Sequence, residues 1–533
     1  MKQYIVLILL VVLTFAASLQ NSFVWDDYGL ITDNPQINLP LKDFFSVFTM
    51  PLWKFSGSPE SRRDYYRPAV SAFFILNYKI WGLNPAGFHL SNIILHLLAV
   101  IILYRIGLLL FEKEKDRELI SLIAASIFAV HPVHNEPVGR AASGDVIFGF
   151  FVILSLYYFL KEKRYLSFFA FFLALLSKEP AVMLPFALVI LAIHKKGFKK
   201  GLIEIIPYLI LVGMYLILRV IYVDIAMGYS VPQALFTKVL TMFAATSDYV
   251  RLLVVPYPLR PFYPARWYMS VTEPRVLMAI VVLTVVSFLV FKLKKDKVML
   301  FLMLFPFVML APVIWRVNTF SVGFDLVYIA ERFLYIPAMA FSLFISASVT
   351  RLLKGSSRRY LLIGWILITL TFAGITVSSN KMWESDFNLV KTVVEQSPNA
   401  SFAHESLGNA YKEMGRMDDA MREWQRAIEL SPYSTEDAMK EWQKAVELNP
   451  SNSQAYNSMG NVYFLRGYYE SAVWMYQKAI KADTGNAETY YNLAMALEKT
   501  GKVKEAAVYY REFIKIAPEQ YKDIVSELKK RGF

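Results

Sequence analysis

The sequence contains no cysteine among its 533 residues. This absence excludes disulfides, thiolate nucleophiles, cysteine-ligated zinc sites and iron–sulfur clusters. Charged residues are also scarce, at 19% of the chain, whereas a soluble domain holds roughly 25%. The chain has no glycine-rich phosphate-binding loop, which disfavours a soluble nucleotide-sugar as substrate.

The scarcity of charge is confined to residues 1–380, while residues 381–533 have the composition of a soluble protein. We therefore predict an all-α chain with two domains: a polytopic membrane domain at 1–380 and a soluble domain at 381–533. About eleven apolar stretches have the length of a transmembrane helix, near residues 4–20, 89–111, 118–134, 144–160, 164–178, 180–194, 202–222, 275–292, 298–315, 332–350 and 360–379. A cleaved signal peptide is the alternative to an uncleaved first helix.

The net charge of +13 lies mostly in short loops between apolar runs. Membrane topology therefore explains it better than a nucleic-acid partner does. Positive charge favours the cytoplasmic side, which predicts a cytoplasmic N-terminus in a multi-pass cell membrane protein. The long loops 21–88 and 223–274 and the soluble domain are then extracytoplasmic.

The soluble domain shows the spacing of tetratricopeptide (TPR) repeats, which are 34 residues long. We predict repeats at 401–434, 453–486 and 487–520, a half repeat at 435–452 and a closing helix at 519–531. Stacked repeats form an α-solenoid whose concave face binds a peptide or protein. A purely structural role is the alternative.

Ionisable residues gather on the loops that we predict to be extracytoplasmic. Such residues at membrane ends mark a functional site by default. The pair Asp26-Asp27 follows the first apolar run directly. The further candidates are Arg67, His131, His134, Glu136, Arg140, Lys178, Glu179, Glu331, Arg332 and Tyr335.

These residue types suit a carboxylate base beside phosphate-binding cations. Asp26 could take a proton from a hydroxyl nucleophile, and Arg140, Lys178 and Arg332 could hold a phosphate leaving group. A lipid-phosphate donor could reach this depth sideways from the bilayer. The alternatives are that Arg140 and Lys178 only extend to the interface, and that Glu331 and Arg332 form an internal ion pair.

The loop with His131, His134 and Glu136 has alternatives of its own. Its residue types suit a metal site or a contact with donor or acceptor. The two prolines of the segment His131-Pro132-Val133-His134-Asn135-Glu136-Pro137 favour a role in shaping the loop.

Several of these segments together resemble a known family. The sequence is similar to GT-C-fold glycosyltransferases, and closely resembles the transmembrane and TPR repeat-containing O-mannosyltransferase-like proteins, relatives of the protein O-mannosyltransferases. The resemblance rests on Trp25-Asp26-Asp27 with Asn34-Pro35, Tyr66-Arg67-Pro68, His131 to Glu136 with Gly139-Arg140, Lys178-Glu179, Glu331 to Tyr335 and the repeats after about residue 399.

The resemblance implies an inverting transfer of a sugar from a polyprenyl-phosphate donor to an extracytoplasmic acceptor, most simply in protein O-glycosylation. It maps the family's catalytic acidic pair onto Asp26 and Asp27. The sugar, the carrier lipid and the acceptor stay open. A divalent metal also stays open, with Asp26, Asp27 and Glu136 as its oxygen ligands if one binds.

Two other functions compete with glycosyl transfer. One is a lipid or glycan transporter, which would carry charges at mid-membrane depth, where this sequence has few. The other is a membrane-embedded assembly scaffold for the cell envelope, with a protein-binding TPR domain.

Overall fold

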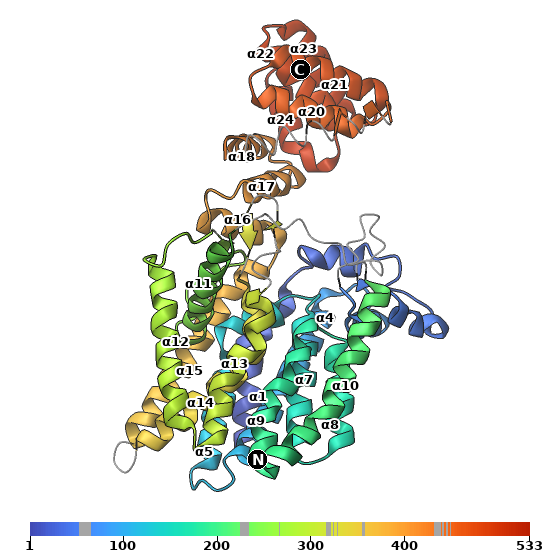
Figure 1. Ribbon diagram of the computed structural model, residues 1–533. Coiled ribbons are helices and arrows are strands. Elements are labelled where there is room, and N and C mark those ends of the chain that lie inside the picture. The colour runs from blue at the N-terminus through green and yellow to red at the C-terminus, as the bar shows by residue number, and fades with distance from the viewer. Residues whose placement is uncertain are drawn as a thin grey trace. The chain divides into compact units, whose positions relative to one another are not determined.

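The computed structural model describes residues 1–52, 65–223, 234–265, 267–315, 321–322, 325–327, 329–353, 358–430, 439, 442–443, 446–447 and 449–533. The chain forms two compact units, Met1–Leu389 and Val390–Phe533, and Figure 1 shows that both are built of helices. The predicted all-α class is confirmed.

Unit 1 consists of long helices joined by short turns and 3₁₀ or π segments. Its helical elements are α1 Lys2–Phe15, η1 Ala16–Gln20, η2 Tyr28–Thr32, η3 Leu41–Thr49, α3 Pro68–Trp81, α4 Pro85–Leu110, α5 Arg117–Val130, η4 Pro132–His134, α6 Asn135–Gly139, α7 Gly144–Leu160, α8 Arg164–Leu175, η5 Glu179–Met183, α9 Leu184–Lys196, α10 Phe198–Tyr222, α11 Leu235–Val254, α12 Pro274–Leu293, α13 Lys297–Trp315, η7 Glu331–Leu334, α14 Tyr335–Leu352, α15 Arg358–Asn380 and η9 Lys381–Trp383.

One small sheet accompanies these helices. Its strands are β1 Pro264–Ala265, β2 Ser321–Val322 and β3 Asp325–Val327, antiparallel in the order β1-β3-β2. Its register pairs Pro264 with Val327 and Ser321 with Leu326. The sheet joins the 256–273 loop to the segment that precedes η7.

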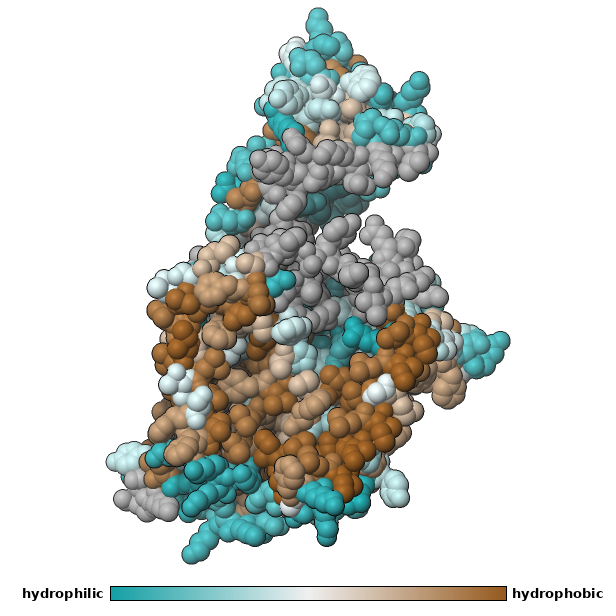
Figure 2. Space-filling view, in the orientation of Figure 1, coloured by the Kyte–Doolittle hydropathy of each residue, from teal (hydrophilic) through white to brown (hydrophobic). Residues whose placement is uncertain are grey.

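Each of the eleven apolar stretches forms helix in the structure. Seven helices of the described chain are long and apolar enough to cross a membrane, and an eighth candidate is the pair Pro132–Gly139 and Gly144–Leu160, bent by 113°. The face seen in Figure 2 is hydrophobic across the middle of unit 1 and hydrophilic at the end that carries the N-terminus. The chain is therefore a multi-pass membrane protein. Helices α5, α8 and α9 are 14, 12 and 13 residues long, so the count of eleven spans stays a prediction.

Small side chains let the central helices of unit 1 approach closely, as is usual in membrane helix packing. Ala124 and Ala125 of α5 and Ala340 and Ala347 of α14 are buried in one core cluster. The hydroxyl of Ser346 in α14 donates a hydrogen bond to the carbonyl of Ile120 in α5 (2.6 Å). This contact fixes α14, and with it the residues just before α14, against α5.

Prolines stop or start the helices at the end of unit 1 opposite the N-terminus. Pro132 lies two residues after the end of α5, Pro180 lies at the start of η5, and Pro68 begins α3. Proline has no backbone N–H and cannot continue a helix that precedes it. The chain therefore turns at these points, and polar side chains at the helix ends face one another.

Unit 2 consists of helical hairpins. Helix α16 (Asp386–Gln396) begins in unit 1 and ends in unit 2. It is followed by α17 Ser401–Glu413, α18 Met417–Leu430, α20 Ser453–Leu465, α21 Tyr469–Ala482, α22 Ala487–Lys499, α23 Val503–Ile516, η10 Glu519–Tyr521 and α24 Lys522–Lys530. Two helical glycines face an aromatic ring of the next helix, Gly408 with Trp424 and Gly460 with Tyr476, and an added Cβ would overlap the ring. The predicted half repeat at 435–452 lies mostly outside the described residues.

Candidate active site

Asp27 is a buried carboxylate that holds two parts of the chain together. Its side chain has no exposed surface. Its Oδ2 accepts a hydrogen bond from the amide of Val24 (3.0 Å) and its Oδ1 from the amide of Ala142 (2.9 Å). Burial raises the pKa of Asp27, against the opposing effect of Arg140 and the two amides. Both oxygens are thus engaged, one within its own loop and one with the turn after α6.

Asp26 lies beside this anchor but has a different environment. Its side chain is 42% exposed, and its Oδ2 is 3.2 Å from Nη2 of Arg140. The preceding residue, Trp25, adopts φ = 53°, a left-handed conformation that is uncommon for a bulky residue. Asp26 therefore presents an accessible carboxylate from a sharply turned backbone.

The backbone around Arg140 is held by buried polar side chains. Nδ2 of Asn92 in α4 donates to the carbonyls of Arg140 (2.7 Å) and Ala141 (3.2 Å). Nδ2 of Asn21 donates to the carbonyl of Gly139 (3.3 Å). Together with Asp27, these contacts fix the turn from which the buried Arg140 side chain reaches Asp26.

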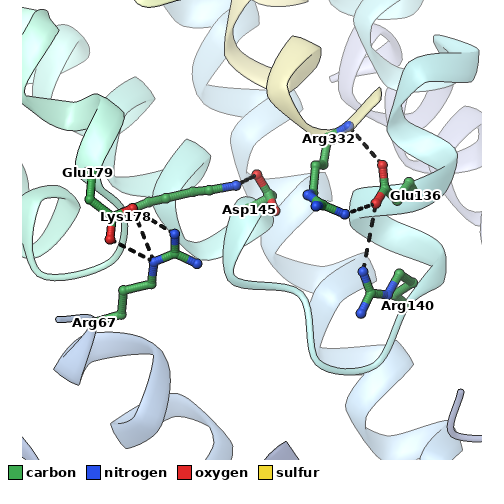
Figure 3. Close-up of polar contacts among 7 residues, drawn as sticks. All are labelled: Arg67, Glu136, Arg140, Asp145, Lys178, Glu179 and Arg332. Atoms are coloured by element: carbon green, nitrogen blue, oxygen red, sulfur yellow. Dashed lines mark hydrogen bonds and ion pairs between the residues drawn. The ribbon is translucent and has the colours of Figure 1, made fainter. Parts of the chain in front are cut away.

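A chain of ion pairs continues from Arg140. Glu136, one helical turn earlier, lies 3.7 Å from Arg140 and also forms an ion pair with Arg332 (Figure 3). The amide of Arg332 donates to the same carboxylate (3.1 Å). The side chain of Arg332 is 37% exposed, so its guanidinium can donate hydrogen bonds to a further anionic group.

Lys178 lies in the turn between α8 and η5, outside both helices, and pairs with Asp145 in the first turn of α7. Figure 3 shows Asp145 between the ammonium of Lys178 and the guanidinium of Arg332. Burial lowers the pKa of Lys178 to about 8, although Asp145 favours its charged form. The ammonium also lies 4.7 Å from the centre of the Phe333 ring.

A small cavity opens at this pair, and its walls are of two kinds. Asp145, Lys178 and Arg332 form the charged wall. The apolar wall consists of Phe148, Pro180, Met309, Val313, Phe333, Ile336 and Pro337. The cavity thus places two cations and one carboxylate beside apolar side chains.

Arg67 and Glu179 form a separate pair at the neighbouring helix ends, with 2.7 Å between Nη2 and Oε2. Burial alone would raise the pKa of Glu179, but the guanidinium of Arg67 lowers it. Arg67 also lies over the ring of Tyr65, 4.1 Å from its centre. This pair joins α3 to η5 and so supports the turn that carries Lys178.

Four of the predicted site residues are buried among core side chains. Nε2 of His131 donates to the carbonyl of Leu253 (3.1 Å). His134 packs against Tyr335, and the Tyr335 hydroxyl is 2.9 Å from Nδ1 of His96. Glu331 accepts from the amide of Arg260 (2.8 Å) and the hydroxyl of Tyr263 (2.6 Å). Glu331 therefore turns away from Arg332 and forms no ion pair with it.

Arg140 and Lys178 do not extend to the interface, because both are buried and ion-paired. Among the described residues, no group of three or more His, Asp or Glu side chains is placed to hold a metal ion. The donor chemistry agrees, since both oxygens of Asp27 accept amide hydrogens and Arg140 lies against both Asp26 and Glu136. The three carboxylates thus do not fit a metal.

Sequence reasoning did not select several residues that shape the site. Asn21 and Asn92 fix the 139–142 turn, and the ring of Trp383 lies 5.7 Å from the Arg140 guanidinium carbon. The available signal was an asparagine within or next to an apolar helix, since a buried amide needs partners. Asp386 accepts a hydrogen bond from the amide of Trp25, which lies 361 positions earlier in the sequence. No local pattern marks such a residue.

Comparison with known families matches both halves of the chain. Residues 67–223 match the model "Dolichyl-phosphate-mannose-protein mannosyltransferase", a range that includes Arg67, Arg140 and Lys178. TPR models match residues 403–434, 434–467, 460–501 and 487–520. The resemblance seen in the sequence is confirmed.

Individual relatives extend the likeness over most of the chain. Protein O-mannosyl-transferase F38B6.6 of Caenorhabditis elegans is 27% identical over 81% of this chain and 63% of its own length. Protein O-mannosyl-transferase TMTC1 of Homo sapiens is 26% identical over 79% of this chain and 54% of its own length. TMTC4 of Homo sapiens is 33% identical over 29% of this chain and 22% of its own length. The chain thus spans only about half to 63% of the first two relatives.

Proposed function

We propose that this protein is an integral-membrane glycosyltransferase that moves a sugar, most simply mannose, from a polyprenyl-phosphate donor to a hydroxyl of an extracytoplasmic protein. The relatives named as protein O-mannosyl-transferases support the reaction class. The observation that carries the proposal is the contrast within the acidic pair. Asp26 is accessible and ion-paired, whereas both oxygens of Asp27 are engaged.

In the proposed step, the acceptor hydroxyl oxygen attacks the anomeric carbon of the donor sugar. The bond between that carbon and the phosphate oxygen breaks, and polyprenyl phosphate leaves with the electron pair. Asp26 takes the hydroxyl proton as general base. A single displacement inverts the configuration at the anomeric carbon. Asp27 positions Asp26 by fixing the loop to the 139–142 turn.

The donor phosphate would bind at the charged wall of the cavity. Arg332 offers a partly exposed side chain whose guanidinium can bind a phosphate bidentately, and Lys178 adds an ammonium as a point charge. Arg140 connects this wall to Asp26 through Glu136. The apolar wall from α13 and α14, including Met309 and Val313, suits the first isoprene units. Charge that develops on the leaving phosphate is stabilised most by such fixed cations.

Unit 2 would bind the acceptor protein or a partner, as TPR arrays do along a concave face. Its substrates would be hydroxyl-bearing peptides. The alternating basic loops support an orientation with the N-terminus in the cytoplasm and unit 2 outside. The bilayer lipids and the lipid-phosphate donor complete the expected partners.

The experiment is a transfer assay on the purified full chain in lipid vesicles, with polyprenyl-phosphate mannose and a serine- and threonine-rich peptide. We expect Asp26→Asn to abolish transfer while donor binding is kept. Asp33→Asn is the matched control, since Asp33 is an exposed carboxylate of the same loop and should leave transfer intact. Full transfer by the Asp26→Asn variant would refute the assignment.

A further inference from the structure

The loop that carries Asp26 is bound by the last segment of unit 1. The amide of Ser22 donates to the carbonyl of Glu384 (3.0 Å). The amide of Trp25 donates to Oδ1 of Asp386 (2.9 Å). Nδ2 of Asn21 lies 3.4 Å from Oδ1 of Asn380. Three successive contacts thus align residues 21–25 with residues 380–386.

The hydrogen bond to Asp386 comes from a residue, Trp25, whose backbone conformation needs support from its surroundings. With φ at 53°, Trp25 occupies the left-handed region, which a bulky residue adopts only when its surroundings enforce it. Asp27 fixes the chain after this residue through the amides of Val24 and Ala142. Asp386 fixes the amide of the left-handed residue itself.

The segment that supplies Asp386 is a firm support. Met382 and Trp383 are buried, and the Trp383 ring packs beside the Arg140 guanidinium. The same short segment therefore contacts both sides of the Asp26–Arg140 ion pair. It touches the backbone before Asp26 through Asp386 and the side chain of Arg140 through Trp383.

We propose that Asp386 is a positioning residue for Asp26. It holds Trp25 in the left-handed conformation and so directs the Asp26 carboxylate toward the acceptor hydroxyl. This inference rests on the function proposed above, because it assumes that Asp26 is the base. Asp386 contacts no phosphate-binding cation in any interaction that the described residues show, so its contribution concerns the chemical step and not donor binding.

Asparagine and alanine at position 386 should differ in their effect. The interaction needs one acceptor oxygen and no negative charge, since only Oδ1 contacts the amide. Asparagine keeps that oxygen at the same distance along the side chain, whereas alanine removes it. Asp386→Asn should therefore retain the function that Asp386→Ala loses.

The test measures transfer and donor binding for the full chain in lipid vesicles, with polyprenyl-phosphate mannose as probe. A misplaced catalytic group costs up to about a hundredfold in rate, so we expect Asp386→Ala to lower kcat by about tenfold or more. The donor dissociation constant should stay unchanged, and Asp386→Asn should restore kcat. Glu395→Ala, which removes an exposed carboxylate of the same helix, is the matched control.

Three results would overturn the proposal: wild-type kcat in Asp386→Ala, an equal loss in Asp386→Asn, or a parallel loss of donor binding that reveals general misfolding. These outcomes are separate from failure of the proposed function. That failure would appear as absence of transfer by the wild-type chain, or as full transfer by Asp26→Asn.

Discussion

Replacing Asp27 should unfold the loop, whereas replacing Asp26 should stop the chemistry alone. Asp27→Ala leaves the buried amides of Val24 and Ala142 without their acceptor. Each orphaned buried donor costs about 1–3 kcal/mol, so the expected loss is about 2–6 kcal/mol. Asp27→Asn keeps one acceptor and should lose about half as much. Asp26 is 42% exposed, and the buried Arg140 keeps Glu136 as a second partner, so Asp26→Asn should cost only about 1 kcal/mol.

The assay is thermal unfolding of the detergent-solubilised chain, followed by intrinsic fluorescence from its 10 tryptophans. Thiol-reactive dyes do not apply, because the chain has no cysteine. We expect the lowest apparent melting temperature for Asp27→Ala and an intermediate one for Asp27→Asn. Asp26→Asn should melt close to wild type. An inactive Asp27→Ala variant that melts like wild type would refute the structural role of Asp27.

Two further predictions concern Lys178 and the packing of Tyr335. Burial lowers the pKa of Lys178 to about 8, so its ammonium is lost as the pH rises through that value. Affinity for a polyprenyl-phosphate sugar should fall past pH 8 in wild type but not in Lys178→Arg, and equal pH profiles in a binding titration would contradict this. A Cβ on Gly149 would overlap the Tyr335 ring, so Gly149→Ala should cost about 1–3 kcal/mol by overpacking. Gly213→Ala, where an added Cβ meets nothing within 4 Å, should not lower the melting temperature, and equal melting of both variants would exclude the overlap.

The fold was largely predictable because apolar length and repeat spacing are local properties. Each apolar stretch forms helix, and the paired Gly408 and Trp424 show why the repeat needs a small residue opposite a large one. The number of spans was less predictable, since helices such as α5 and α9 are shorter than the apolar run around them. The turns at Pro132 and Pro180 end the preceding helices early, and composition alone does not reveal where each helix ends.

The site was predictable in residue type but not in role. Asp26, Arg140, Glu136 and Arg332 come together as one chain of ion pairs. His131 and Glu331 looked equivalent to them on the same loops, yet both face the core. The position of a residue on a loop does not tell whether its side chain faces the site or the core. The catalytic and binding roles of Asp26, Arg140, Glu136, Arg332 and Lys178 stay predictions.

The decisive measurement is a structure of the full chain with polyprenyl-phosphate mannose bound, trapped by Asp26→Asn. We expect the phosphate within hydrogen-bonding distance of Arg332 and Lys178, the first isoprene units against Met309 and Val313, and the anomeric carbon facing residue 26. A phosphate bound elsewhere in unit 1, with the Lys178–Asp145 and Arg332–Glu136 pairs undisturbed, would contradict it.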